Sequence, residues 1–313
     1  MEKIVVITGP TATGKSRLAV MLARQFGGEI VSADSMQVYR GLDIGTAKIR
    51  PEETLGVPHH MLDVCDPKQN YSAARYVADA DECVREILSR GKLPLVCGGT
   101  GLYIDSLVSG RGFEGGEPSQ ALRRELNAQY DELGGQALLK KLAQVDPDRA
   151  AKLHPSDKKR LVRALEVYAA TGRTISEHDA LSRAVPPRYD AATIVLSFRD
   201  RQKLYERIDA RVDAMFKLGL VEEVRALLAS GVAEASTAMQ AIGYRQLASA
   251  FRGEMSLNEA KEAVKRESRR YAKRQLTWLR AKSDVFWIFF DEEPDFEFAR
   301  QVSAEFLHSR GLK

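Results

Sequence analysis

The sequence predicts an α/β fold in which helices cover both faces of a parallel sheet and a helical segment is inserted into the sheet domain. Two observations predict it. Short apolar runs of strand length alternate with helical patterns along the chain, whereas one long stretch in the middle shows helical periodicity alone. Strands that alternate with helices form parallel sheets, because each connection returns to the starting edge through a helix.

The first predicted strand and its loop carry a glycine motif. The apolar run Ile4–Ile7 leads into Gly9–Ser16, which reads G-x-x-x-x-G-K-S, and the helical pattern Arg17–Phe26 follows. This order of strand, glycine loop and helix is the context of a phosphate-binding loop (P-loop). It predicts a fold like that of P-loop NTPases, in which backbone N–H groups and the helix N-terminus hold the phosphate.

Every residue of this loop is a candidate for binding a diphosphate group. Lys15 would reach the outer phosphate, and the hydroxyl of Ser16 would hold Mg²⁺. The remaining candidates, which form the cradle, are Gly9, Pro10, Thr11, Ala12, Thr13 and Gly14. The motif indicates a bound diphosphate and does not by itself indicate ATP.

Two further predicted strands end next to polar or glycine-rich residues. They are Glu29–Ser32 and Leu93–Cys97, and the helical pattern Ala73–Arg90 lies between them. In open parallel sheets the carboxyl ends of the strands meet at one edge, where ligands bind. We therefore expect the P-loop and the loops after these two strands to face a single crevice.

The loops after these strands each allow two interpretations. Asp34 is either a general base or Mg²⁺ ligand, or it caps a helix. Gly98–Gly101 is either a substrate-facing turn or a plain strand-to-helix turn. In the first case the hydroxyl of Thr100 would both donate and accept hydrogen bonds in the crevice.

The helical segment defines the expected domain organisation. Residues 112–187 contain no strand-like run, and glycines and prolines mark both ends. The strand pattern returns at Ala192–Phe198 and again at Val285–Phe290. We expect residues 1–111 and 188–313 to form a P-loop-type catalytic core, and 112–187 to form a helical insertion.

Two arginines could act on a leaving group. Arg207 and Arg211 are four residues apart on a helix predicted to begin near Asp200, so they share one face. Two guanidinium groups on one face could clamp a leaving pyrophosphate. Asp209 and Asp213 are nearby, so an ordinary ion-paired surface is the alternative.

Basic residues cluster in two segments. One is Lys158–Arg163 in the insertion; the other, Lys261–Lys282, contains nine Lys or Arg and two Glu, with Tyr271 and Trp278 among them. The net charge is only +4, so a surface that binds a polyanion must come from such clustering. Arginines with interleaved aromatic rings favour nucleic acid, whereas a solvated helix face mixes the two signs more evenly.

Composition also limits the class of protein. The three cysteines are far apart without a C-x-x-C pair, which favours reduced core residues over disulfides or zinc. No apolar run has the length of a membrane span, and the chain opens directly on a strand and its loop. We expect a cytoplasmic protein, and a monomer because no exposed heptad pattern occurs.

Six segments, taken together and in order, are similar to the tRNA dimethylallyltransferase (tRNA isopentenyltransferase) family in its bacterial form. They extend from the P-loop to near the end of the chain. The segments are GPTATGKS (Gly9–Ser16), SADSMQVYRGLDIGTAK (Ser32–Lys48), GGTGLY (Gly98–Tyr103), HPSDKKRLVRALEVY (His154–Tyr168), QAIGYRQ (Gln240–Gln246) and KRQLTWLR (Lys273–Arg280).

The resemblance implies a reaction. The dimethylallyl group would move from dimethylallyl diphosphate to N6 of the adenosine at tRNA position 37, next to the anticodon. The P-loop would grip the diphosphate of this donor, Asp34 would take the proton from N6, and Thr100 would contact the substrate. Lys15, Arg207, Arg211 and Mg²⁺ would stabilise the charge of the leaving pyrophosphate.

The resemblance also implies that the anticodon stem-loop of tRNA is a partner. The residues expected to lie against it are Asp34, Ser35, Met36, Gln37, Thr100, Arg123, Lys159, Arg160, Leu161, Val162, Arg163, Gln240, Ala241, Ile242, Gly243, Tyr244, Arg245, Lys273, Arg274, Gln275, Leu276, Thr277, Trp278, Leu279 and Arg280.

Two other classes stay open. A small-molecule kinase would use the same loop with ATP and an arginine-bearing lid, and would leave the aromatic and basic segment without a role. A nucleic-acid-stimulated NTPase needs a second acidic motif, which is not apparent in the sequence. The three classes differ in whether ATP or dimethylallyl diphosphate raises the melting temperature.

Overall fold

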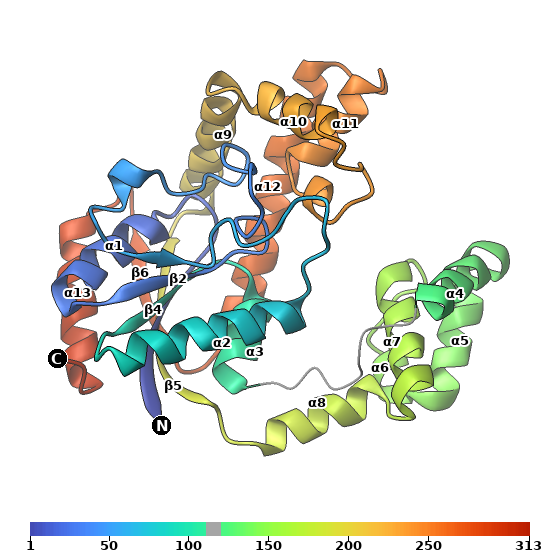
Figure 1. Cartoon of the computed structure of the whole chain (residues 1–313), viewed down its shortest axis with the longest axis horizontal. Helices are drawn as coiled ribbons and strands as arrows, with labels where there is room; N and C mark the ends of the chain where they lie inside the picture. Colours follow the sequence, from blue (N-terminus) through green and yellow to red (C-terminus); the bar gives the residue numbers. More distant parts are fainter. Residues whose placement is uncertain (111–119) are drawn as a thin grey trace. The chain divides into compact units, whose positions relative to one another are not determined.

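A computed structural model describes residues 1–110 and 120–313. The chain divides into two compact units, Met1–Gly110 with Arg188–Lys313 (the core unit) and Arg111–Pro187 (the insertion unit). Both are visible in Figure 1, where the insertion unit is green to yellow-green. Among the described residues, no helix combines the length and the hydropathy needed to span a lipid bilayer.

The core unit is built on a six-stranded sheet in the order β3-β2-β4-β1-β5-β6, and every strand pair in its described part is parallel. The strands are β1 (Glu2–Thr8), β2 (Glu29–Ala33), β3 (His59–His60), β4 (Pro94–Gly98), β5 (Tyr189–Phe198) and β6 (Phe286–Phe290). The predicted α/β class is confirmed. The two-residue strand β3 was not predicted, because two residues are too few to show a period.

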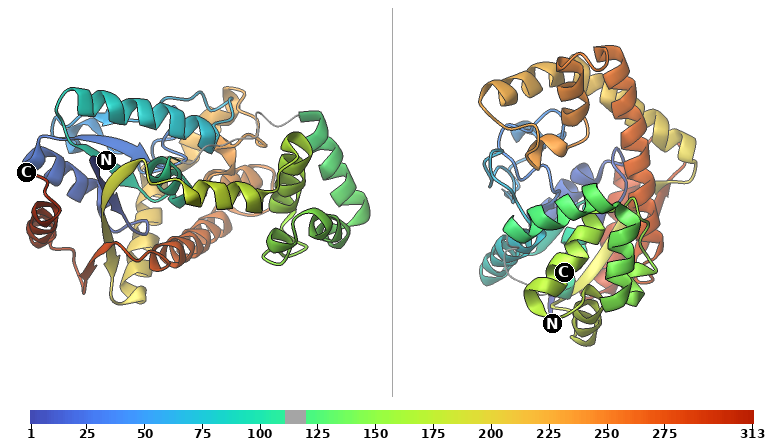
Figure 2. Two further views of the ribbon diagram at one scale, coloured as in Figure 1. Left: turned by 90° about the horizontal axis from the view of Figure 1, so that it is seen from below. Right: turned by 90° about the vertical axis from the view of Figure 1, so that its right-hand side faces the viewer.

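Alternate residues of the strands pack on opposite faces of the sheet. Ile4 and Val6 belong to a core with α2 (Ala73–Ser89) and α3 (Gly101–Ser109), whereas Val5 and Ile7 face the opposite core. That second core contains side chains of α1 (Lys15–Phe26), α9 (Arg201–Lys217) and α13 (Phe296–Ser309). Figure 2 shows helices on both faces of the strands. Burial on both faces explains why these strands read as continuous apolar runs.

Helices after β5 complete the core unit. α9 begins at the N-cap Asp200, and α12 (Leu257–Arg280) packs against it and against α11 (Tyr244–Phe251). Ser256 and Glu259 form a capping box that starts α12. The smaller elements are α10 (Leu220–Ala229) and the 3₁₀ turns η1 (Pro51–Glu53) and η2 (Ala238–Gln240).

The insertion unit has its own small core. Its described helices are α4 (Gln120–Leu133), α5 (Gly135–Val145), α6 (Pro147–Ala150), α7 (Lys158–Thr171) and α8 (Ile175–Ala184). Leu138, Leu142 and Leu161 are buried together at the contact of α5 with α7. A capping box of Thr174 and Glu177 begins α8.

Candidate active site

The P-loop joins β1 to α1, and close approaches require both of its glycines. Gly9 has φ 145°, and a Cβ there would lie 2.2 Å from the carbonyl oxygen of Leu196 on β5. Gly14 has φ 83°, and a Cβ there would lie 2.2 Å from the ring of Phe296. Any larger residue would displace the loop from the sheet edge. Because α1 begins at Lys15, the unpaired N–H groups of its first turn stand at this loop.

Lys15 lies at the centre of the site. Burial lowers the pKa of its ammonium group to about 8, while Cys97 and Asp34 oppose the shift and Arg211 adds to it. Its Nζ donates to the carbonyl oxygen of Pro10 at 2.7 Å. These influences reach Lys15 from three other elements, so the structure brings the P-loop, the end of β2, the end of β4 and α9 together.

Asp34 follows β2 and uses one carboxylate oxygen to stabilise the local turn. Its Oδ1 accepts from the backbone N–H of Met36 at 2.8 Å and of Gln37 at 3.4 Å. Among the described residues, no hydrogen bond to Oδ2 occurs. No helix begins directly after Asp34, so the helix-cap interpretation was wrong. One carboxylate oxygen shapes the turn, and the other is left for a ligand.

Thr100 connects the second glycine turn to the Asp34 loop. Its backbone N–H donates to the carbonyl oxygen of Ala33 at 3.1 Å, and its Oγ1 accepts from the N–H of Ser35 at 3.0 Å. The hydroxyl thus holds the residue next to Asp34. Thr100 is also the N-terminal flanking residue of α3, so this turn both starts a helix and faces the site.

The two predicted clamp arginines point to different partners. Arg207 Nε donates to the carbonyl oxygen of Ala12 at 3.4 Å, and its Nη1 pairs with Glu293 at 2.8 Å. Arg211 instead lies near Lys15 and Asp34; burial lowers its pKa, and the Asp34 carboxylate opposes that shift.

Asp209 and Asp213, which the sequence suggested as ion-pair partners of Arg207 and Arg211, pair with other cations. Asp209 pairs with Arg269 at 2.6 Å, and Asp213 pairs with Lys261 and Lys265. Neither carboxylate contacts Arg207 or Arg211 in an ion pair, because the side chains of both aspartates face α12 rather than the P-loop.

One face of α12 packs on the glycine turn. Tyr271 Oη donates to the carbonyl oxygen of Gly99 at 3.4 Å and is hydrogen-bonded to Thr100. Burial raises the pKa of this phenol to about 12, and the Asp34 carboxylate contributes to the rise. Trp278 Nε1 donates to Asp105 Oδ2 at 2.7 Å.

Two residues predicted to contact tRNA make contacts within the protein. Gln275 is 6% exposed and bonds to both glycine loops, and the indole of Trp278 packs against Gly101 of α3. Their side chains thus join α12 to the glycine loops and to α3, and their contact with tRNA stays a prediction. Tyr271 received no site role from the sequence, although the spacing of Tyr271, Gln275 and Trp278 places them on one helix face.

The outer face of α12, exposed to solvent, carries cations. Lys273, Arg274 and Arg280 are exposed and form no ion pair with a carboxylate among the described residues. The guanidinium of Arg274 lies 5.6 Å from the centroid of the Tyr271 ring. By contrast, four basic residues nearer the start of the helix pair with carboxylates of α9 or with Glu267; they are Lys261, Lys265, Arg269 and Arg270.

Several apolar residues predicted to contact tRNA are buried. They come from motif segments on helices or turns, and a helix presents only one face to solvent. Their side chains are buried inside the protein, where they support the exposed neighbours, and their contact with tRNA stays a prediction. They are Leu161, Val162, Ala241, Tyr244, Leu276 and Leu279.

In the insertion unit, the four basic residues predicted to contact tRNA fall into two groups. Arg123 makes two 3.0 Å hydrogen bonds to the buried carboxylate of Glu166, which Arg163 also contacts at 2.9 Å. Lys159 and Arg160 are exposed at the start of α7. Arg123 and Arg163 therefore neutralise a buried charge, whereas the other two are available to solvent.

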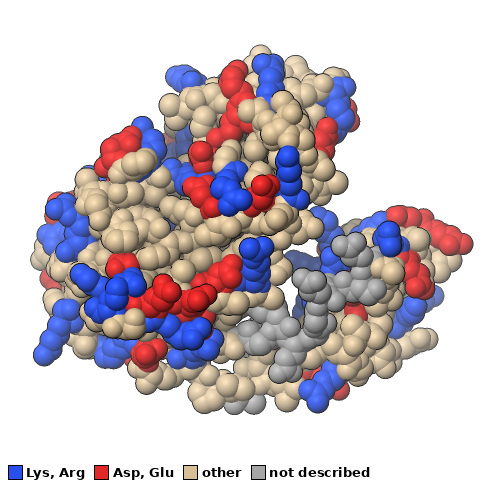
Figure 3. Space-filling model, in the orientation of Figure 1, with Lys and Arg blue, Asp and Glu red and all other residues tan. Residues whose placement is uncertain are grey.

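Charges on the rest of the core unit are mixed. Figure 3 shows basic and acidic side chains interspersed over α2. Arg75 pairs with Asp79 and Arg85 with Asp81 along this helix. This face therefore has no large area of positive charge. The exposed cations of α12 are the clearer positively charged surface.

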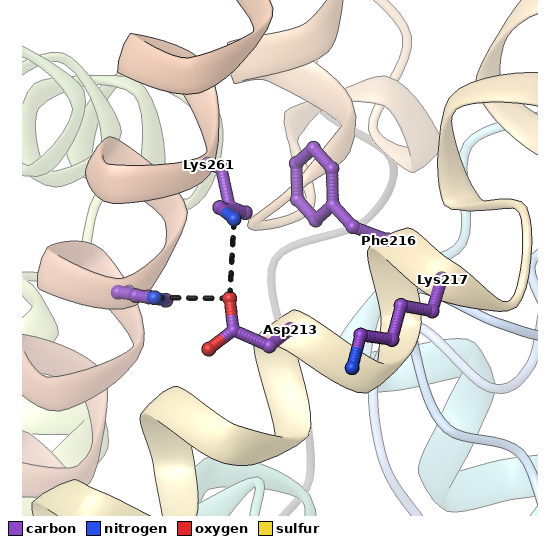
Figure 4. A pocket seen from close by; sticks show the side chains of 5 residues that line it. Asp213, Phe216, Lys217 and Lys261 are labelled. Atoms are coloured by element: carbon purple, nitrogen blue, oxygen red, sulfur yellow. Dashed lines mark ion pairs between the residues drawn. The ribbon is translucent and has the colours of Figure 1, made fainter.

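A cavity of about 470 Å³ lies between α9 and α12, without any P-loop residue in its lining. Figure 4 shows Asp213 between the two lysines of α12, with Phe216 and Lys217 of α9 beside it. Asp213 Oδ1 lies 3.0 Å from Lys265 Nζ and 3.4 Å from Lys261 Nζ. This cavity is separate from the predicted site residues, and its two α12 lysines already share a carboxylate.

A second cavity, of about 20 Å³, adjoins the P-loop at Ser16. Ser32, Gln37 and Cys97 contribute polar atoms to its lining. A space of this size accommodates a single water molecule. It brings the metal-ligand candidate Ser16 next to Gln37, whose Nε2 donates to the carbonyl oxygen of Thr46 at 3.2 Å.

The fold and the site define a P-loop-type α/β enzyme that acts on a phosphate-bearing substrate. A model of the family described as IPP transferase matches residues 37–282, and one described as isopentenyl transferase matches residues 2–67. The chain belongs to the IPP transferase family. This confirms the resemblance found in the six sequence segments.

Similar proteins extend the match over almost the whole chain. The tRNA dimethylallyltransferase of Thermoanaerobacter sp. (strain X514) is 47% identical over 306 residues, 97% of each chain. That of Geobacter sulfurreducens is 49% identical over 286 residues, 91% of each chain.

Two solved structures are also similar. The tRNA isopentenylpyrophosphate transferase of Bacillus halodurans has a TM-score of 0.74 and 40% identity, over 99% of this chain and 98% of that one. A eukaryotic dimethylallyltransferase acting on tRNA has a TM-score of 0.83 and 29% identity, over 100% of this chain and 81% of that one.

Proposed function

We propose that the chain transfers the dimethylallyl group of dimethylallyl diphosphate to N6 of the adenosine at tRNA position 37. The product is N6-(dimethylallyl)adenosine in tRNA, with pyrophosphate released. One observation carries the proposal: Asp34 and Arg211 are near enough to Lys15 to interact with it electrostatically, which places a proton acceptor and two cations around a diphosphate loop. The relatives are named tRNA dimethylallyltransferases, which does not favour a kinase.

The main requirement of this reaction is to stabilise the negative charge of the departing pyrophosphate. The lone pair of adenine N6 is delocalised into the ring, so the allylic carbon must ionise substantially before N6 reaches it. The C1–O bond breaks and its electron pair leaves with pyrophosphate. Lys15, Arg211 and the backbone N–H groups of the P-loop would stabilise that charge where it develops.

Asp34 is suited to accept the proton that adenine N6 loses. As the new C–N bond forms, N6 becomes positively charged and must lose a proton. The Oδ2 atom would accept this proton while Oδ1 keeps its hydrogen bond to the Met36 N–H. Thr100 would hold Asp34 in place through Ser35. The target adenine must leave its stack to reach this position.

Ser16 alone offers too few ligands for a divalent cation, so oxygens of the bound diphosphate would have to supply the others. The hydroxyl of Ser16 is exposed at the P-loop, and no cluster of three or more His, Cys, Asp or Glu able to hold a metal occurs among the described residues. We propose that Ser16 and the diphosphate oxygens would hold Mg²⁺, which favours such oxygen ligands. When bound, it would neutralise charge on the leaving pyrophosphate.

The tRNA would bind through exposed cations. The exposed cations are Lys273, Arg274 and Arg280 on α12, and Lys159 and Arg160 on α7. Arg123 and Arg245 of the predicted set are exposed too, but they pair with Glu166 and Glu267. We assign those on α12 and α7 to the phosphates of the anticodon arm. The core unit would thus carry the chemistry, and residues 112–187 would contribute a second RNA contact.

A labelling experiment tests the proposal. The pure protein is incubated with dimethylallyl diphosphate labelled in the prenyl group and with unmodified tRNA. Label is expected on the adenosine at position 37, and dimethylallyl diphosphate rather than ATP is expected to raise the melting temperature. ATP hydrolysis with no transfer of label would contradict the proposal and support a kinase or NTPase.

A further inference from the structure

A buried glutamine on α12 bonds to both glycine loops of the site. The Oε1 of Gln275 accepts from the backbone N–H of Thr11 in the P-loop at 3.0 Å. Its Nε2 donates to the carbonyl oxygen of Gly99 at 2.9 Å. The side chain is 6% exposed; its hydrogen bond to Gly99 is buried and that from Thr11 is partly buried, so losing them is costly.

The absence of a side chain at Gly99 is explained by this contact. A Cβ at Gly99 would lie 2.1 Å from Gln275 Nε2, with its next neighbour at 3.4 Å in the same side chain. Gly99 has no left-handed φ, in contrast to Gly9 and Gly14 of the P-loop. Glycine at this position therefore leaves room for the amide of Gln275 in its hydrogen-bonded place, and the backbone conformation does not demand it.

The two loops joined by this amide position different reacting groups, namely the diphosphate and the Asp34 carboxylate. In the proposed function, the P-loop binds the diphosphate. The Gly99 turn continues into Thr100, which holds Ser35 and through it the Asp34 carboxylate. A change in the separation of the two loops would change the distance between the leaving group and the base.

We propose that Gln275 is a positioning residue that fixes the P-loop and the Gly98–Gly101 turn relative to each other. The proposal rests on the proposed function of the same site. Small displacements of reacting groups are sufficient to slow a transfer by about 10²-fold, so a side chain that touches no substrate can control the rate. Gln275 would act this way from inside the protein, below the exposed cations of α12.

The substitution Gln275→Met tests the proposal, because it preserves the length of the side chain and removes both hydrogen bonds. We expect kcat/KM for dimethylallyl diphosphate to fall about 10- to 100-fold. We also expect the rise in melting temperature caused by inorganic pyrophosphate to shrink. The Kd for tRNA should change by less than about twofold, because the outer face of α12 is unaltered.

Gln246→Met is the matched control. Gln246 is also a helical glutamine with 6% exposure, and its Oε1 accepts from the N–H of Gly243 at 2.8 Å. It touches neither glycine loop of the site. The control should lower the melting temperature while leaving the pyrophosphate effect and the KM for the prenyl donor unchanged.

A double-substitution cycle tests the contact directly. Gly99→Ala should reduce kcat/KM in the wild-type background, because the new methyl group displaces the Gln275 amide. In a Gln275→Ala background the displaced group is gone, so Gly99→Ala should have a much smaller effect. Equal effects in both backgrounds would contradict the proposed contact.

Other outcomes separate this proposal from the function on which it rests. If the wild-type protein prenylates tRNA and Gln275→Met retains wild-type donor kinetics, the positioning role is wrong. If Gln275→Met only lowers the melting temperature, as the control does, the role is structural. If the wild-type protein transfers no prenyl group, the proposed function fails; an unchanged pyrophosphate shift in Gln275→Met would then overturn the positioning role as well.

Discussion

The sheet edge around Lys15 and the outer face of α12 both present cations, but the structure holds them differently. Lys15 and Arg211 are close to each other and to Asp34, and burial lowers the pKa of both cations. Lys273, Arg274 and Arg280 are exposed and separate. Burial makes charges interact strongly and resist screening, whereas exposed charges act almost independently and are screened by salt.

This difference assigns the two regions to different steps. Groups at the sheet edge should control the rate and donor binding, and their substitutions should not be additive because they share neighbours. Groups on α12 should control tRNA affinity in a salt-dependent way, with nearly additive effects. Four predictions test this division, beginning with the one that has the largest expected effect.

Asp34→Asn should reduce turnover by about 10²–10⁴-fold, because it removes the proton acceptor. The Asn side chain retains an oxygen that can accept from the Met36 N–H, so the turn should persist. Single-turnover rates and tRNA affinity should be measured together. A rate within about threefold of wild type would show that Asp34 serves the turn alone.

Lys15→Ala should reduce kcat/KM for the prenyl donor by about 10²–10³-fold, the usual effect of removing one preorganised group that stabilises developing negative charge. The affinity for tRNA should be almost unchanged. Steady-state kinetics with each substrate varied in turn would measure both effects. An equal loss of affinity for both substrates would contradict the separation of the two regions.

Replacing Lys273, Arg274 and Arg280 together with Ala should weaken tRNA binding about 50- to 150-fold near 0.15 M salt, if each contacts one phosphate. The slope of log Kd against log salt should fall by about three units for duplex contacts and by less for single strands. Binding isotherms at several salt concentrations measure this change. Donor KM should stay at the wild-type value.

A matched triple replacement on the same helix controls for the loss of charge. Lys261, Lys265 and Arg270 already pair with Asp213 or Glu267. Their replacement with Ala should change the salt slope much less. Equal slopes for the two triple variants would remove the outer face from the RNA interface and leave Lys159 and Arg160 as the main candidates.

The smallest effect is expected from pH. The pKa of Lys15 is about 8 in the folded protein, below its ordinary 10.5, so its positive charge is lost as the pH rises through 8. kcat/KM for the prenyl donor should fall about tenfold per unit above that value. Lys15→Arg should remove the decline, because its guanidinium stays protonated. A decline that persists in Lys15→Arg would have another source.

The same pKa shift has a consequence for stability, with the opposite dependence on pH. Between pH 8 and 10.5 the unfolded chain binds the Lys15 proton more strongly than the folded chain does. The contribution of Lys15 to the free energy of unfolding should therefore increase with pH over this window. Comparing wild type with Lys15→Met in denaturant titrations isolates that contribution.

Local patterns were sufficient to predict the strands and the P-loop. The runs Ile4–Ile7, Ala192–Phe198 and Val285–Phe290 lie in or overlap β1, β5 and β6. Such patterns depend on neighbours a few residues apart, which the sequence displays directly. The same reasoning missed β3, whose pairing depends on β2 rather than on its own residues.

The roles of residues within the motifs were less predictable. Gln240–Arg245 reads as one polar and aromatic turn, yet Tyr244 is fully buried and donates to Glu223 at 2.5 Å. Glu223 in turn accepts from the backbone N–H groups of Asp43, Ile44 and Gly45. A motif marks where a family has constraints, and it does not separate side chains that touch a ligand from those that hold the fold.

The sequence by itself determined the order of strands, loops and helices, because hydrophobic period and glycine chemistry act between near neighbours. Only the tertiary structure decided which side chains meet at the sheet edge. Gln275 bonds to Gly99, 176 positions away, and to Thr11, 264 positions away. Such contacts exist only after the parallel sheet has brought the loops together and α12 has packed beside them, so no local pattern in the chain encodes them.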